Sequence, residues 1–225
     1  MQTDALIQLL VDEVSPVRAL APPWRRAGGW LAISLASLVL VIAFLSPDPA
    51  RIANIRAQRF WLEQIAALTT GFAAAAAAMS SIVPGRSRRA WSLPLAPLGL
   101  WIGVIVWGCV LDWAQRGAAG LVIRSDWPCV VAMIVAAVLP AMLIMGMLRR
   151  GAPLAPRAAA ALAGLAVAGL SSATACLSRP SPHGTTATVL VWHFGVLLAM
   201  IGGAVIAGRH LHAWPVTRSL AGRFQ

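Results

Sequence analysis

The chain has 225 residues, of which 59% are hydrophobic and only 11% charged, and its mean hydropathy is +0.78. This apolar content excludes an ordinary soluble globular domain. The 18 basic residues are all arginines and give a net charge of +11, but they occur in small groups between long apolar runs, which argues against a continuous nucleic-acid-binding face.

Residues 1–26 precede the first long apolar run and have the pattern of a short amphipathic helix. Its apolar positions recur at helical spacing, and we call them the N-terminal apolar strip: Leu6, Ile7, Leu10, Val14 and Val17. Gln8, Asp12 and Glu13 lie largely on the opposite side. Because that opposite side is acidic, the strip is expected to bind a protein rather than an anionic lipid surface.

Six apolar runs follow, each long enough to cross a hydrocarbon core of about 30 Å as a helix of roughly 20 residues. We place them at 27–45, 61–83, 91–112, 128–148, 159–178 and 186–208. The predicted fold class is all-α: a polytopic membrane protein with a six-helix transmembrane bundle at 27–208. Residues 209–225 are then a tail.

An even number of spans places both termini on one side, and the arginines indicate which side this is. Twelve arginines flank the spans on the side of the termini: Arg18, Arg25, Arg26, Arg86, Arg88, Arg89, Arg149, Arg150, Arg157, Arg209, Arg218 and Arg223. The opposite side has six: Arg51, Arg56, Arg59, Arg116, Arg124 and Arg179. By the positive-inside rule the termini are cytoplasmic.

Tryptophans and small residues add two further expectations. Most tryptophans lie near predicted span ends, where an indole N–H can stay hydrated: Trp24, Trp30, Trp61, Trp91, Trp113, Trp127 and Trp214. Small residues at four-residue steps predict close contacts between helices: Gly195, Ala199 and Gly203 in the sixth span, Gly164 and Ala168 in the fifth, Gly99 and Gly103 in the third.

The spans contain few residues of the types that carry out proton or metal chemistry. Glu63 and Asp112 lie at span ends and are expected at the outer interface. His193 lies inside the sixth span, where we expect a hydrogen bond to a neighbouring helix, with a sensor or ligand role as the alternative. The sequence has no catalytic motif, so we predict that the protein is not an enzyme and has no metal or cofactor.

Three cysteines are all predicted at the outer face: Cys109, Cys129 and Cys176. In an oxidising compartment a pair of thiols can form a disulfide or bind a soft metal such as zinc or cadmium. The alternative is that each is a small buried hydrophobe. Cys176 shares a helix face with Ser172 and Ala173, which predicts a position toward a close-packed interior.

Nearly the whole chain carries a series of short motifs in a fixed order: Thr3 to Ile7, Ser15 to Arg18, Pro22 to Arg25, Trp127-Pro128-Cys129, Leu148 to Arg157, Cys176, Trp192-His193, and Gly208 to Leu211 with Trp214. Together they resemble the NrsF-like family of negative regulators of sigma F, which are six-span bacterial anti-sigma factors. The resemblance implies an inner-membrane protein that holds an extracytoplasmic-function sigma factor through its cytoplasmic N-terminal part. It also implies that Cys129 and Cys176 form a thiol pair responding to oxidant or heavy metal, with Cys109 additional.

The sequence departs from the family pattern in two places. Leu177-Ser178-Arg179 follow Cys176 where acidic residues are usual, which weakens a metal-site interpretation. Residues 215–225 extend past the usual end.

The leading interpretation is a membrane-bound anti-sigma factor with no direct nucleic-acid binding. Its N-terminal apolar strip binds a sigma factor, its spans contact lipid, and periplasmic metal or redox stress releases the sigma factor. The short loop from Arg149 to Arg157 is the expected relay between the thiols and the N-terminal segment. The alternative is a small multi-span transporter or channel subunit, for which a few polar residues inside the spans are candidates: Ser34, Ser37, Thr69, Thr70 and Ser171. A membrane enzyme is a third class, without a visible catalytic set.

Overall fold

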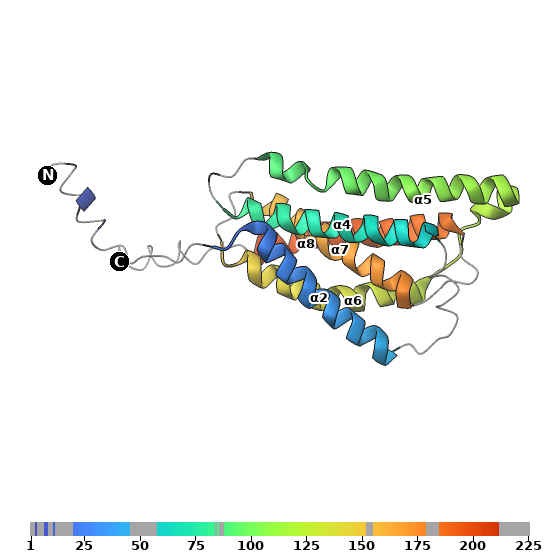
Figure 1. The fold of residues 1–225 in the computed structure, drawn as a ribbon, viewed down its shortest axis with the longest axis horizontal. Coiled ribbons are helices and arrows are strands. Elements are labelled where there is room, and N and C mark those ends of the chain that lie inside the picture. Colours follow the sequence, from blue (N-terminus) through green and yellow to red (C-terminus); the bar gives the residue numbers. More distant parts are fainter. Residues whose placement is uncertain are drawn as a thin grey trace.

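A computed structural model of the chain describes residues 20–45, 58–83, 85, 88–151, 155–178 and 185–211, together with residues 3, 7, 8 and 11. The secondary structure of these residues is helical, with no strands among them (Figure 1). The α helices are α2 (Pro23–Leu45), α4 (Gln58–Ser81), α5 (Leu95–Arg116), α6 (Trp127–Leu148), α7 (Pro156–Ser178) and α8 (Thr186–Leu211). Two short 3₁₀ helices, η1 (Arg88–Ser92) and η2 (Gly117–Leu121), flank α5.

The predicted all-α class is confirmed, and each of the six apolar runs corresponds to one α helix. Among the described residues, four helical stretches are long and apolar enough to cross a membrane: Phe60–Ser81, Arg89–Leu121, Trp127–Leu148 and Thr186–Gly208. The side chains at the ends of α2 and α7, residues 41–45 and 174–178, lie outside the described ones. The count of six spans and the side of the termini stay predictions.

The third predicted span, 91–112, does not begin as one continuous α helix. Residues 88–92 form η1, and the α helix starts only at Leu95. Pro94 stands at the N-cap of α5. A proline disfavours helical geometry in the residue before it, so the chain bends here instead of continuing one helix from residue 91.

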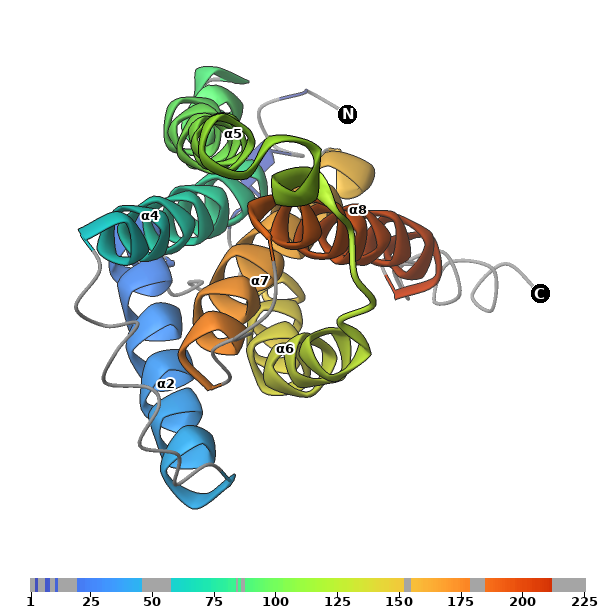
Figure 2. The ribbon, with the colours of Figure 1, turned by 90° about the vertical axis from the view of Figure 1, so that its right-hand side faces the viewer.

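Helix α7 lies at the centre of the bundle and packs against α4, α6 and α8 (Figure 2). Every residue from 163 to 173 is buried, so α7 has no solvent- or lipid-facing side in this stretch. The stretch is mostly alanine, glycine and serine. Such small side chains allow neighbouring backbones to approach closely, which is the main source of helix association in lipid.

Two glycines of α7 mark the closest approaches. A Cβ on Gly169 would lie 2.9 Å from the carbonyl oxygen of Ala67 and 3.1 Å from the backbone nitrogen of Gly71, both in α4. A Cβ on Gly164 would lie 2.9 Å from the Cα of Ile201 in α8. The predicted contact of the Gly164 strip with another helix is therefore confirmed.

The other two predicted small-residue interfaces are wrong within this chain. Gly195, Ala199 and Gly203 are exposed on α8, and Gly99 and Gly103 are exposed on α5. A Cβ at any of these four glycines would meet nothing within 4 Å. Helix α8 instead presents a different face, which includes the buried Leu197, to the bundle. Spacing alone does not distinguish an inward strip from an outward one.

One tryptophan also departs from its expected place at a span end. Trp30 is 1% exposed, and its Nε1–H donates to the carbonyl oxygen of Pro140 inside α6 at 2.9 Å. Trp24, Trp61 and Trp127 are at least half exposed, as expected for an interfacial belt. The indole of Trp30 is satisfied by a helix carbonyl rather than by water.

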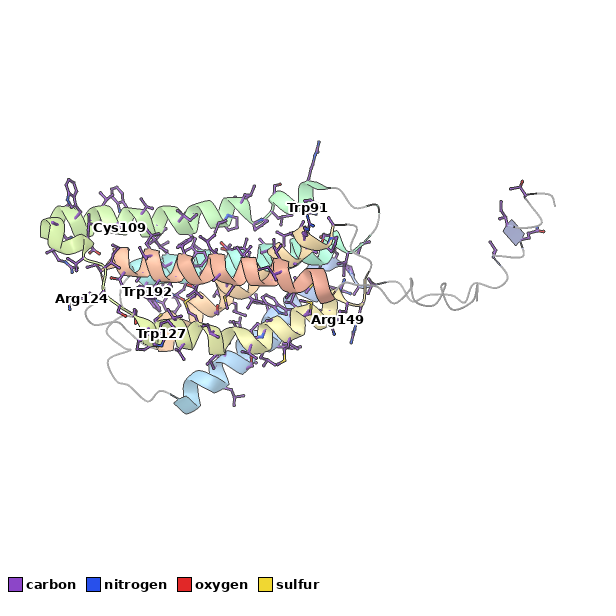
Figure 3. The ribbon with its side chains drawn as sticks, turned by 180° about the vertical axis from the view of Figure 1, so that it is seen from behind. Trp91, Cys109, Arg124, Trp127, Arg149 and Trp192 are labelled. Atoms are coloured by element: carbon purple, nitrogen blue, oxygen red, sulfur yellow. The ribbon has the colours of Figure 1, made fainter. Side chains whose placement is uncertain are left out.

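The bundle has two distinct ends (Figures 1 and 3). Trp91 and Arg149 lie at one end, where α2 also begins and α8 also ends; we call it the terminal end. Arg124, Trp127 and Trp192 lie at the other, which we call the distal end. This arrangement agrees with an even number of passes.

We expect Gly169→Ala to destabilise the bundle, because the added methyl meets backbone atoms of α4 that cannot move independently. The cost of such overpacking is about 1 to 3 kcal/mol. Gly195→Ala is the matched control, since its methyl enters open space and alanine favours helix. Thermal unfolding of the detergent-solubilised chains measures the stability of both variants. Equal stability of the two variants would contradict the close approach.

Candidate functional site

Residues 3, 7, 8 and 11 of the N-terminal segment are helical and exposed. Ile7 is 52% exposed and Val11 is 64% exposed, and the two are four residues apart on one helix face. Gln8 is also exposed. The other members of the N-terminal apolar strip, Leu6, Leu10, Val14 and Val17, lie outside the described residues. Val11 extends the same apolar pattern and was missed, although its helical spacing from Ile7 is visible in the sequence.

At the distal end, three buried side chains from three helices meet. Sγ of Cys129 in α6 lies 3.2 Å from Nε2 of His193 in α8, and Oγ of Ser172 in α7 lies 2.8 Å from Nδ1 of the same ring. The exposed fractions are 7% for Cys129, 4% for His193 and 3% for Ser172. We call this group the Cys129–His193–Ser172 cluster.

The cluster confirms that His193 is hydrogen-bonded to a neighbouring helix, and it adds a contact that the sequence did not predict. Both ring nitrogens have a partner, one on each of two helices. In one tautomer Nδ1–H donates to the Ser172 hydroxyl and Nε2 accepts from the Cys129 thiol; in the other tautomer the roles are reversed. Either way, one imidazole links α6, α7 and α8.

The other two cysteines have different relations to this cluster. Cys176 lies in α7 one helical turn after Ser172, and its side chain is outside the described ones. Ser172 and Ala173 are buried, as expected for that face. Cys109 is a partly exposed cysteine on α5, a helix that contributes no side chain to the cluster. The pairing of Cys129 with Cys176 stays a prediction.

The start of α8 is held by a carboxylate of α5. Oδ2 of Asp112 accepts the backbone N–H of Thr186 at 2.9 Å as well as the Thr186 hydroxyl. Its Oδ1 accepts from Arg116 at 3.2 Å. A negative charge at a helix N-terminus is favourable because of the free N–H groups and the helix dipole. Asp112 is at the distal end as expected, but it is buried rather than facing water.

Residues 122–126, which lead into α6, are bound to the first turns of α8. Thr185 accepts the Thr188 N–H as a helix N-cap and donates its hydroxyl to the Val122 carbonyl at 2.8 Å. The indole of Trp192 donates to the Arg124 carbonyl at 2.9 Å. Cys129 and His193 are thereby kept in register. No local sequence pattern predicts this connection, and its signal in the sequence is the group of threonines at the start of the sixth predicted span.

Among residues with described side chains, no group of three or more His, Cys, Asp and Glu lies close enough together to hold a metal ion. The cluster has one cysteine and one histidine. Its described polar atoms form a hydrogen-bonded chain of thiol, imidazole and hydroxyl.

The model of the NrsF family, negative regulator of sigma F, matches residues 10–214. The chain belongs to the NrsF family. The match includes the whole of α2 to α8 and therefore all three parts of the cluster. NrsF membership indicates a regulatory role with a sigma factor as partner. Neither the curated proteins nor the solved structures contain a match.

We expect Trp192→Phe to increase the reactivity of Cys129, because it removes a bond that ties the residues leading into α6 to α8. Loss of one such hydrogen bond is worth about 1 kcal/mol, roughly a fivefold increase in transient opening. The rate of maleimide labelling is measured in a chain with Cys109→Ser and Cys176→Ser. Trp127→Phe is the control, since that indole is 62% exposed. An unchanged labelling rate in Trp192→Phe would contradict the role of this bond.

Proposed function

We propose that the chain is an anti-sigma factor of the bacterial inner membrane. Its cytoplasmic N-terminal segment sequesters an extracytoplasmic-function sigma factor and releases it when thiols at the periplasmic face meet metal or oxidant. The observation that carries the proposal is the NrsF match over residues 10–214. The helices and the distal cluster support its finer parts.

Membrane insertion with six spans is supported by the surface of the bundle. Large apolar side chains are exposed on α2 and α8, among them Val39 at 65%, Leu198 at 67% and Ile206 at 63%. Apolar side chains in this number suit lipid rather than water. The start of α2, the end of α8 and Arg149 share one end of the bundle, and the excess of arginine there favours a cytoplasmic terminal end (Figure 3).

The transporter alternative has less support from the described residues. The hydroxyls of Ser37, Thr69, Thr70 and Ser171 each donate to a carbonyl of their own helix. This bonding is the usual way in which such side chains are satisfied inside a helix. It accounts for these four of the five candidate side chains without a polar path across the membrane. The fifth, Ser34, is buried, and its hydroxyl has no hydrogen-bond partner among the described residues.

Sigma-factor binding by the N-terminal segment is supported by its exposed apolar side chains. Ile7 and Val11 have no cover from the bundle, although both are large and apolar. An apolar stripe on a short helix binds typically in a groove of a partner protein. The N-terminal segment also leads directly into α2, whose first turns contact α6.

We expect Ile7→Asp to abolish capture of the sigma factor by the detergent-solubilised chain. An apolar side chain that anchors a helix in a partner's groove commonly contributes about 2 kcal/mol or more to binding, which is about thirtyfold in affinity. Leu6→Asp and Leu10→Asp should weaken capture in the same way. Gln8→Asp is the matched control, because it adds the same charge on the polar side. Equal losses at Ile7 and Gln8, or capture that survives deletion of residues 2–15, would exclude binding by this helix.

The contacts between α6 and α2 support a route from the thiols to the N-terminal segment. Cys129 lies in the first turn of α6, at the distal end. Toward the terminal end, Pro140 and Met147 of the same helix accept bonds from Trp30 and Arg26, the latter at 2.8 Å. A displacement of α6 at Cys129 would therefore act on the first turns of α2. This link is a second possible route for the signal, in addition to the loop from Arg149 to Arg157.

We expect release of the sigma factor to require both the thiols and this link. In vesicles treated with a thiol oxidant, the chain with Cys129→Ser and Cys176→Ser should retain its sigma factor, because the thiolates that react are gone. Trp30→Phe leaves the thiols but removes the bond to Pro140, so it should bind normally and release less.

Cys109→Ser is the control for the thiols and should release normally. For each variant, release is measured as the amount of sigma factor that remains on the vesicles after sedimentation. Normal release by the double cysteine variant would leave the cysteines as packing residues. Normal release by Trp30→Phe would exclude the α2–α6 link as the route.

A further inference from the structure

We infer that the terminal end of the bundle binds the phosphate of an anionic phospholipid between Arg26 of α2 and Arg150, which follows the end of α6. The inference rests on the proposed function for membrane insertion alone. It adds a lipid partner at the end of the bundle opposite to the cysteines. Basic pockets between transmembrane helices on the cytoplasmic side are a recurring type of site for anionic headgroups.

Arg26 is a charged side chain enclosed where α2 meets α6. It is only 9% exposed, and its Nη2 donates to the carbonyl oxygen of Met147 at 2.8 Å. Its other terminal nitrogen, Nη1, is buried and has no hydrogen-bond partner in the part of the chain that the structure describes. Burying a charge is costly unless the charge is paired. One carbonyl oxygen satisfies one N–H but leaves the positive charge of the guanidinium without a counter-charge.

The charge that acts on Arg26 from nearby has the same sign. Arg150 interacts electrostatically with Arg26, and its own side chain is exposed. Two guanidinium groups near each other repel, so the pair favours an anion beside it. A phosphate suits this place, because its oxygens accept hydrogen bonds from two guanidinium groups in the geometry that arginine prefers. Since Arg150 is exposed, its side chain can reposition around the anion.

The helices supply no carboxylate for this role. The carboxylates that follow Glu13 in the sequence are Asp48, Glu63, Asp112 and Asp126. Asp112 and Asp126 lie at the distal end, Glu63 lies in the first turns of α4, which are also distal, and Asp48 comes between the end of α2 and the start of α4 (Figure 1). The counter-anion therefore comes from the membrane or from the N-terminal segment, which has three acidic residues.

The membrane is favoured by the level at which the two arginines lie. Trp24, two residues before Arg26, is 58% exposed, and exposed tryptophans are typical of the headgroup region. Toward the distal end, both helices continue with exposed apolar side chains, among them Ile33 of α2 at 57% and Leu139 of α6 at 39%. A phospholipid whose phosphate lies between the arginines can therefore lay its acyl chains along apolar surface.

An occupied site would strengthen the contact between α2 and α6. The anion neutralises the repulsion between Arg26 and Arg150 while Arg26 keeps its bond to Met147. The first turns of α2 follow directly on the N-terminal segment. The content of anionic lipid in the membrane would thus determine how firmly this part of α2 is held on α6.

The test is native mass spectrometry of the detergent-solubilised full chain with added phosphatidylglycerol or phosphatidylcholine. About 0.5 M ammonium acetate screens the general attraction between exposed arginines and anionic lipid. Under these conditions the chain should retain one phosphatidylglycerol and release phosphatidylcholine. Equal retention of the two lipids would overturn the inference.

The variants separate this pair of arginines from general positive charge. Arg150→Gln and Arg26→Gln should each weaken retention of phosphatidylglycerol by about tenfold or more, because each removes charged hydrogen-bond donors from the phosphate. Arg157→Gln is the matched control: it removes the same charge from an exposed position in the same loop and should bind unchanged. Arg150 is exposed, so its variant remains informative even where Arg26→Gln unfolds. Equal retention by the Arg150 and Arg157 variants would overturn the site.

Two further arms identify the source of the anion. Inorganic phosphate should not displace the bound lipid; displacement would assign the site to a free anion and overturn the lipid as ligand. A chain with Asp12→Asn and Glu13→Gln should retain phosphatidylglycerol at least as well as the unchanged chain. Retention that occurs only in this variant would show that the N-terminal carboxylates occupy the site, and would also overturn the inference.

Capture of the sigma factor is measured separately on the same variants. Retention of one phosphatidylglycerol by a chain that captures no sigma factor would contradict the proposed function and support the lipid site. Normal capture by a chain that retains no phosphatidylglycerol would support the function and overturn the site.

Discussion

Backbone contact at Gly169 and Gly164 determines how closely α4, α7 and α8 approach one another. A methyl group at either position would meet backbone atoms, so the spacing of the three helices follows from the absence of two side chains. Residues 163–173 of α7 are buried as a result. The distal cluster depends on the same spacing, because Ser172 reaches His193 only when α7 and α8 are in close contact.

The sequence was sufficient for the number and approximate limits of the helices, because apolar runs near 20 residues between arginines and prolines have few other structures. It was insufficient for the direction in which each helix face points. The strip of Gly164 and Ala168 faces inward, whereas Gly195, Ala199 and Gly203 face outward, although the spacing is similar. That choice depends on helix rotation, which tertiary contacts determine.

The candidate site was predictable only in part for the same reason. Cys129 and His193 are each chemically notable in the sequence, but they are 64 residues apart and no local pattern joins them. Their meeting depends on the Thr185 cap and on the bond from Trp192 to Arg124, which orient the start of α8. Trp30 was misplaced because a buried carbonyl can satisfy an indole as well as water does.

The central position of α7 also has a consequence for synthesis of the protein. In chain order α7 follows α2, α4, α5 and α6, yet it is the helix around which α4, α6 and α8 pack. Before α7 has been made, α4, whose residues Ala73 to Ala78 are all buried in the finished bundle, lacks the helix against which it packs most extensively. The ribosome therefore completes most of the chain before the interior of the bundle can close.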